Sequence, residues 1–225
     1  MAIATTNSIL LLPEVQSVLE RLHTLADTGD EVIIQQFLAS GADWNSTSSE
    51  QKATVFQSAL LPISRDVGRF LYGVARSISA QRIVEFGTSY GVSTIYFAAA
   101  LHDVGGGLII GSELECSKVQ KATEHLREAG LSQYAEIRMG DALQTLRDTG
   151  GMIDLLFLDG WKDLYLDVLH LLLGSLRSGC VVIADDLNIA LEELTPYLEY
   201  VRNPDNGFVS VELAIDDGIE YSVKL

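Results

Sequence analysis

Seven short runs of mostly apolar residues, each the length of a strand, follow one another after residue 80. We expect strands at Arg82–Phe86, Leu108–Ser112, Ala135–Met139, Ile153–Leu158, Val181–Ala184, Phe208–Leu213 and Glu220–Lys224. Helix-length stretches separate the first six. Continuous apolar runs such as "LLFL" and "VVIA" are typical of strands covered by helices on both faces, and this alternation favours a parallel sheet with right-handed crossovers. The pattern predicts a doubly wound α/β fold.

The two ends of the chain depart from this alternation. Residues 13–38 have helical apolar spacing, Ser40–Gln51 forms a loop or a helix start, and another helix begins at Arg65. At the other end, only "AIDDG" separates the last two strands, which favours an antiparallel hairpin. We therefore expect a helical N-terminal extension over residues 1–60, acting as a lid or dimer contact. Residues 61–225 would form a domain with a seven-stranded, mostly parallel sheet.

Composition excludes several classes of protein. The 225 residues suffice for one core, and no apolar run reaches the roughly 20 residues that cross a bilayer. Fifteen basic against 31 acidic residues give a net charge of −16, which argues against nucleic acid and anionic membranes as partners. The N-terminus lacks the basic region of a signal peptide, so we expect a cytoplasmic protein. Cys116 and Cys180 match no metal-ligand spacing and are expected to be buried or half-buried thiols.

The first strand ends in "IVEFGTSYGVST", where Gly87 and Gly91 frame a turn. A turn without Cβ atoms lets a ligand approach the backbone, the next helix offers free N–H groups, and Ser93 adds a hydroxyl. The spacing differs from the dinucleotide motif G-x-G-x-x-G, and Glu85 would repel a pyrophosphate. A nicotinamide cofactor is therefore disfavoured. Packing alone explains such a turn about as often as ligand binding does.

The second and third strand ends carry acids. Glu113 follows an apolar strand at the place where a carboxylate accepts ribose hydroxyls. Asp141 and Ala142 stand at a helix start, where an aspartate also serves as an ordinary N-cap. Because ligands bind beyond the carboxyl ends of parallel strands, a turn and two acids at successive ends favour a nucleoside site.

This combination, from about Ile63 to the C-terminus, resembles the class I S-adenosylmethionine (SAM)-dependent methyltransferases. By that resemblance the cofactor contacts are Ile63, Ser64, Glu85, Gly87, Thr88, Gly91, Ser93, Glu113, Asp141, Ala142, Asp159 and Trp161. Glu85 would meet the amino-acid end of SAM, Ser93 its carboxylate and Glu113 its ribose. The adenine would lie near Asp141 and Trp161.

The fourth and fifth strands end in Asp159 and in the pair Asp185-Asp186. If these strands are neighbours, three carboxylates converge and repel one another, so the cluster needs a cation or raised pKa values. A hard divalent ion answers that need: Mg²⁺ by default, with Mn²⁺ or Ca²⁺ as alternatives. No histidine stands at a strand end, which argues against zinc. Alone, "DD" after a strand is more often a loop or helix cap.

"FLDGWKDLY" followed by "ADD" resembles the metal-dependent O-methyltransferases of the catechol and caffeoyl-coenzyme A type, in which "LD-x-x-K-x-x-Y" precedes "D-N" or "D-D". The resemblance implies Asp159, Asp185 and Asp186 as metal ligands and Lys162 as the general base. Asp186 stands where asparagine is usual. Gly160 replaces an aromatic or imidazole side chain, which implies a roomier cofactor pocket.

These residues predict transfer of a methyl group from SAM to one hydroxyl of a vicinal diol on a small, catechol-like acceptor. A phenol with a pKa of about 10 must lose its proton, which the ion and Lys162, its own pKa lowered by the ion, would promote. The negative charge argues against a coenzyme A thioester as acceptor. Acceptor identity would be set by the segment around Trp44 and the loop "NIALEEL".

Three alternatives stay open. The first is a metal-independent methyltransferase with a structural acid cluster, and the second is a non-catalytic SAM-binding protein of the same fold. A nicotinamide oxidoreductase is the third and most distant. The resemblance also implies a homodimer.

Overall fold

The computed structural model describes residues 8–42 and 47–225. One seven-stranded sheet has the order β3-β2-β1-β4-β5-β7-β6, in which the first five strands are parallel and β7 and β6 are antiparallel. The strands are β1 Arg82–Phe86, β2 Leu108–Glu113, β3 Ala135–Met139, β4 Ile153–Leu158, β5 Leu176–Ala184, β6 Phe208–Leu213 and β7 Ile219–Lys224. The predicted doubly wound sheet with its C-terminal hairpin is confirmed.

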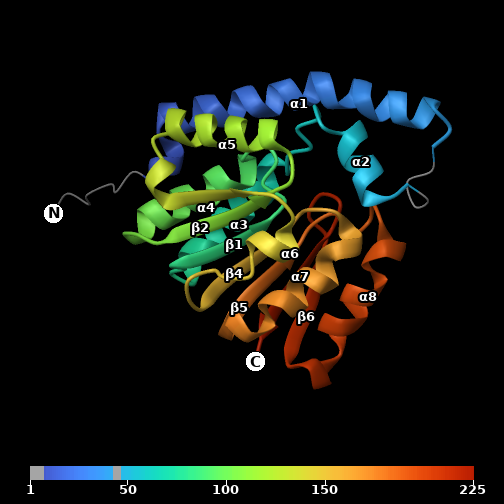
Figure 1. Ribbon diagram of the computed structural model, residues 1–225. Coiled ribbons are helices and arrows are strands. Elements are labelled where there is room, and N and C mark those ends of the chain that lie inside the picture. Colours follow the sequence, from blue (N-terminus) through green and yellow to red (C-terminus); the bar gives the residue numbers. More distant parts are fainter. Residues whose placement is uncertain (1–7, 43–46) are drawn as a thin grey trace.

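Helices cover both faces of the sheet (Figure 1). They are α1 Pro13–Ala39, α2 Ser49–Val55, α3 Arg65–Ser77, α4 Val92–Val104, α5 Cys116–Glu128, α6 Ala142–Thr145, α7 Tyr165–Leu172 and α8 Leu191–Arg202. Short 3₁₀ turns are η1 Ile9–Leu11, η2 Ser132–Tyr134, η3 Lys162–Leu164, η4 Leu173–Ser175 and η5 Pro204–Asn206. Helices α3, α4 and α5 pack on one face with α1 lying across them, and α6, α7 and α8 pack on the other.

The core has two halves because each central strand is buried on both sides. In β4, Leu155 and Phe157 belong to the half under α4, whereas Leu156 and Leu158 belong to the half under α7. Successive side chains of a strand point to opposite faces, so a strand in this position must be apolar throughout. This is why "LLFL" shows no alternation.

Strand β5 begins at Leu176, five residues before the predicted start at Val181. Its first part, "LRSG", contains polar residues and Gly179 with φ 75°, and the register between β4 and β5 shifts there. A strand end at the sheet margin tolerates polar residues, so the apolar pattern alone did not reveal it. The other predicted strands agree within one residue.

The N-terminal extension is joined to the sheet domain by a shared core and a buried ion pair. Val15, Val18 and Leu22 of α1 belong to the same core half as α4. Lys52 of α2, only 2% exposed, pairs with Glu193 at the start of α8 at 2.5 Å. The extension therefore packs as part of one body with residues 61–225. Trp44 lies outside the described residues.

The two thiols have different surroundings. Cys180 is buried in the core, and burial raises its pKa to about 12. Cys116 is exposed at the start of α5, so the prediction of a buried or half-buried thiol is wrong there. Within the described ranges, no helix is both long enough and apolar enough to span a bilayer.

Asp103, at the end of α4, anchors the start of the extension. Its carboxylate accepts hydrogen bonds from the Ile9 N–H at 3.1 Å and the Tyr72 hydroxyl at 2.7 Å. Burial alone would raise the pKa of Asp103, but hydrogen bonds from Ser8, His102, Tyr72 and the Ile9 backbone outweigh it and lower the pKa to about 2. The charged form is therefore bound more tightly in the folded protein.

We expect Asp103→Asn to lower the thermal midpoint at pH 7. Because the folded pKa lies below the unfolded value of roughly 4, the wild-type advantage is present above that pH and is lost as pH falls towards the folded value. Thermal melts of both proteins from pH 7 down to acid measure this. Asp66→Asn, at a side chain 82% exposed, is the control and should leave the midpoint unchanged. An equal loss for Asp103→Asn at all pH values would contradict the prediction.

Candidate active site

The parallel strands β1, β4 and β5 end level with one another. Phe86 pairs in register with Leu158, and the residues that follow the three strands are Gly87, Asp159 and Asp185. The Asp159 N–H donates to the Phe86 carbonyl at 2.9 Å, and the Asp185 N–H donates to the Leu158 carbonyl at 3.0 Å. The backbone pairing thus continues one residue beyond the strands and fixes the glycine turn and both aspartates at one rim.

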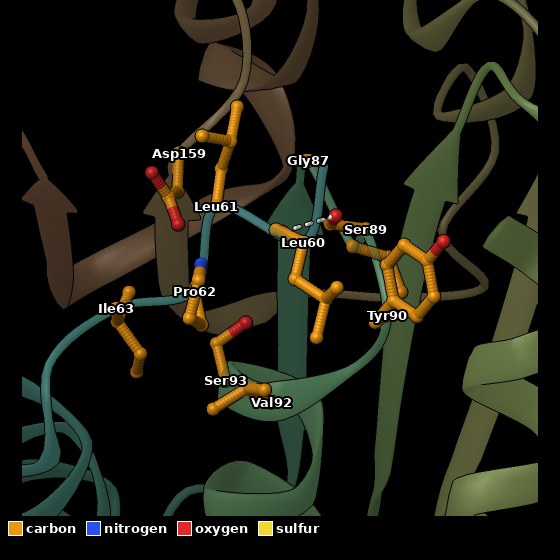
Figure 2. Close-up of a pocket in the computed structure, with 11 residues that line it drawn as sticks. Leu60, Leu61, Pro62, Ile63, Gly87, Ser89, Tyr90, Val92, Ser93 and Asp159 are labelled. Carbon is orange, nitrogen blue, oxygen red and sulfur yellow. Dashed lines mark hydrogen bonds between the residues drawn. The ribbon is translucent and has the colours of Figure 1, made fainter. Parts of the chain in front are cut away.

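A cavity of about 600 Å³ opens at this rim. The predicted residues in its wall are Ile63, Gly87, Glu113, Asp141, Asp159, Trp161, Lys162, Asp185 and Asp186. A small recess shares part of that wall and adds Thr88 and Ser93 (Figure 2). The predicted residues that line neither space are Ser64, Glu85, Gly91 and Ala142. The structure therefore places the glycine turn after β1 and the acid cluster after β4 and β5 in the wall of one cavity.

Two glycines at the rim are required by close packing. Gly87 has φ 98°, and a Cβ there would lie 2.3 Å from the Asp159 carbonyl oxygen. A Cβ at Gly160 would lie 2.5 Å from the Phe86 ring. Phe86 occupies the space beside Gly160 and itself lines the cavity, and the roomier cofactor pocket expected from Gly160 stays a prediction.

Glu85 lies beneath the glycine turn and is fully buried. Its carboxylate accepts hydroxyl hydrogen bonds from Thr88 at 2.9 Å, Ser93 at 2.6 Å and Thr94 at 2.6 Å. Burial raises the pKa of Glu85, and the three hydroxyls counter that rise. Through these hydrogen bonds Glu85 connects the glycine turn to the start of α4. The hydroxyl proton of Ser93 is donated to Glu85. Their predicted contacts with SAM stay predictions.

Glu113 is oriented by the backbone. It accepts hydrogen bonds from the Ser89 N–H at 2.7 Å and the Glu115 N–H at 2.9 Å, one on each oxygen. Each carboxylate oxygen keeps a further lone pair, so the half-buried side chain can still accept ribose hydroxyls from the cavity. Asp141 lines the same cavity and also caps α6, accepting from the Leu143 N–H at 2.9 Å.

Lys162 lies among the acids of the rim. Its ammonium donates to Asp186 Oδ2 at 2.8 Å and to the Tyr165 hydroxyl at 2.7 Å, and lies 3.6 Å from Asp159 Oδ1. Burial alone lowers the pKa of Lys162, but the Tyr165 oxygen and the two carboxylates outweigh it and raise that pKa well above its usual value. In this arrangement Lys162 is charged and neutralises part of the cluster.

Without the ammonium of Lys162, the carboxylates of Asp159, Asp185 and Asp186 would repel one another. Burial raises the pKa of Asp159, with further contributions from Asp185 and Asp186, and Lys162 opposes the rise. Burial and then Asp186 raise the pKa of Asp185 to about 7. Asp186 has φ 65°, a left-handed conformation that asparagine and aspartate tolerate better than most residues.

These oxygens fit a hard divalent cation by their chemistry. In geometry, however, no group of three or more histidine, cysteine, aspartate or glutamate side chains among residues 8–42 and 47–225 is arranged to hold a metal ion. The ammonium of Lys162 lies between Asp159 and Asp186 instead. The metal ligands predicted from the sequence therefore stay a prediction.

Most of the cavity wall was not predicted from the sequence. Ile34, Phe37 and Phe56 come from the N-terminal extension, and the ring of Trp161 packs against the cluster formed by Phe37 and Phe56. Other unpredicted wall residues include the charged side chains of Lys118, Asp216 and Asp217. Ile189, in the predicted loop "NIALEEL", also lines the cavity. Helical spacing in α1 indicated an apolar face but not what it covers.

The fold is that of the class I methyltransferases. Residues 84–187 match a methyltransferase domain family. An O-methyltransferase from Bacillus cereus, solved in complex with SAH, has the same fold, with a TM-score of 0.68 at 19% identity over 93% of this chain and 99% of that one.

The curated relatives narrow the class. A catechol O-methyltransferase of Niastella koreensis is 30% identical over 131 residues, which are 56% of this chain and 58% of the relative. Caffeoyl-CoA O-methyltransferase 2 of Zea mays is 27% identical over 173 residues, 72% of this chain and 65% of the relative. The chain is thus similar to SAM-dependent O-methyltransferases of the catechol and caffeoyl-CoA type. The match spans less than two thirds of the length of these relatives.

We expect Gly87→Ala to abolish SAM binding, because the added Cβ meets backbone of the neighbouring loop and the φ of 98° is unfavourable for alanine. Isothermal titration with SAM and a thermal melt measure the two effects. Gly73→Ala in α3 is the matched control, because its Cβ would meet nothing within 4 Å. This variant should bind SAM normally, and its free energy of unfolding should rise by about 0.5–1 kcal/mol. Normal SAM binding by Gly87→Ala would refute the role given to the turn.

Proposed function

We propose that this protein is an O-methyltransferase that moves the methyl group of SAM to one hydroxyl of a small, catechol-like acceptor with the help of a divalent cation. The observation that carries the proposal is the single cavity at the ends of β1, β4 and β5, whose wall contains both the nucleoside-type residue Glu113 and the cluster of Asp159, Lys162, Asp185 and Asp186. Cofactor and acceptor would therefore meet at one rim.

The glycine-turn side of the cavity suits SAM. Gly87 exposes backbone, Glu113 has free lone pairs, and Asp141 lies in the wall beyond it. The relative from Bacillus cereus was solved with SAH, the product that SAM leaves after methyl transfer. Bound SAM supplies an electrophilic methyl group on a sulfonium.

The other side suits an uncharged or cationic aromatic acceptor better than a coenzyme A thioester. Phe37, Phe56 and Phe86 offer aromatic surface. Among the described residues, eight acidic side chains face the cavity against two basic ones: Glu113, Glu115, Asp141, Asp159, Asp185, Asp186, Asp216 and Asp217 against Lys118 and Lys162. Such a wall repels the phosphates of coenzyme A. Phe37 and Phe56 of the N-terminal extension form part of the wall on this side.

Proton removal falls to Lys162. Its ammonium is held by Asp186 and Tyr165 within the cavity wall, at the place where an acceptor hydroxyl would enter. Asp159, Asp185 and Asp186 would hold a divalent ion, which would supply charge stabilisation for a phenolate. Lys162 would take the phenol proton in its uncharged form.

The metal-independent and the non-catalytic alternatives require different things of the acid cluster. A metal-independent transferase would keep the Lys162–Asp186 ion pair as its working state, and the 2.8 Å contact is the observation that favours it. A non-catalytic SAM-binding protein would need neither the lysine nor the acids. We also propose that the protein forms a homodimer in which the extension is a contact. Analytical ultracentrifugation would measure this oligomeric state.

The decisive experiment is mass-spectrometric detection of methylated product from a panel of catechols with SAM, before and after EDTA dialysis and with Mg²⁺ restored. We expect product, its loss on chelation and its recovery with Mg²⁺. Undiminished product after chelation would select the metal-independent alternative. SAM binding without product from any catechol would select the non-catalytic one.

Lys162→Ala should reduce the rate by about a hundredfold or more, as expected for a lost general base. The same variant should still bind SAM in a titration, which separates loss of chemistry from loss of folding. Lys121→Ala removes an exposed lysine paired with Glu124 on α5 and should leave the rate unchanged. Wild-type rates for Lys162→Ala would remove the lysine from the mechanism.

A further inference from the structure

Asp30 is an acidic residue of the extension helix α1 that points inward. It is 7% exposed, and its carboxylate accepts the backbone N–H of Leu60 at 2.8 Å and that of Leu61 at 2.7 Å, one on each oxygen. Its partners are 30 and 31 residues away along the chain. An acid that accepts two backbone N–H groups fixes that piece of backbone more firmly than a neutral acceptor would.

The backbone that Asp30 holds is unfavourable by itself. Leu61 has φ 43°, a left-handed conformation that a leucine rarely adopts, and Pro62 follows it. Such a conformation persists only where surrounding contacts determine it. The two hydrogen bonds to Asp30 are such contacts.

This segment, Leu60 to Ile63, lies over the glycine turn (Figure 2). It lines the small recess, and Leu61 to Ile63 also line the large cavity. The Ser89 hydroxyl of the turn donates to the Leu60 carbonyl at 2.7 Å, shown as the dashed line in Figure 2. The Ser89 N–H in turn donates to Glu113 at 2.7 Å.

A continuous chain of hydrogen bonds thus runs from Asp30 through the 60–63 segment and Ser89 to Glu113. Its two ends are the extension helix and the carboxylate assigned to the ribose. Ser89 also has a left-handed backbone, with φ 45°, so both facing strained residues depend on these bonds.

We propose that Asp30 is a positioning residue for the SAM pocket, which holds the 60–63 segment against the glycine turn so that Ser89 and Glu113 are in place before the cofactor arrives. The inference rests on the proposed function, since it gives the extension a part in SAM binding. Asp30 lines neither the recess nor the large cavity, so it would act through the segment.

The test is isothermal titration of SAM into wild type, Asp30→Asn and Asp103→Asn. In Asp30→Asn the carboxamide keeps one acceptor but turns an NH₂ group towards the other N–H, so the segment is released. We expect the Kd for SAM to rise about tenfold, the loss of a binding contribution of about 1.4 kcal/mol. The KM for SAM should rise with it, while kcat at saturating SAM is retained.

Asp103→Asn is the matched control because Asp103 likewise accepts a backbone N–H of the front segment, at Ile9, but lines neither cavity. It should lose stability and keep the wild-type Kd, since general destabilisation leaves the affinity of the folded protein unchanged. If Asp30→Asn fails to fold, Ser89→Ala takes its place. It removes the hydrogen bond from the Ser89 hydroxyl to the Leu60 carbonyl, which holds the 60–63 segment from the side of the glycine turn, and should weaken SAM binding in the same way.

Wild-type affinity in Asp30→Asn, or in Ser89→Ala where that variant replaces it, would overturn the inference and leave the proposed function standing. Equal weakening in Asp103→Asn would also overturn it. Failure of the wild type to bind SAM at all would overturn the proposed function, and the inference with it.

Discussion

The level ends of β1, β4 and β5 are the constraint on which the candidate site depends. Backbone hydrogen bonds beyond the strands hold the Gly87, Asp159 and Asp185 loops so close together that the first of them has no room for a Cβ. Both aspartates line the cavity that opens beyond these strand ends.

Electrostatics then decide what these side chains do. One ammonium, that of Lys162, compensates Asp186 closely and Asp159 less closely, while Asp185 is left with a pKa of about 7. The cluster is therefore under-neutralised in the protein alone. A bound cation would compensate the remaining negative charge of the three acids.

The sequence sufficed for the sheet because apolar strands buried on both faces leave a strong pattern, and for the wall residues Glu113, Asp159 and Asp185 because they stand at the ends of such strands or directly after them. The sequence did not show that the hydroxyls of Thr88, Ser93 and Thr94 donate hydrogen bonds to Glu85. A polar residue in a sequence does not indicate where its side chain points. Nor could the sequence connect Asp30 with Leu60 and Leu61, because the donors to its carboxylate are backbone N–H groups, which every residue except proline has.

The distribution of thiols has a practical consequence for the study of this molecule. Of the two cysteines, one is sealed in the core with a thiol that stays protonated at neutral pH, and the other stands exposed at the head of α5. Its neighbours Glu115 and Lys118 face the cavity. A maleimide fluorophore or spin label would accordingly attach at a single place in the unaltered chain, beside the cavity mouth, and report on occupancy without any engineered residue.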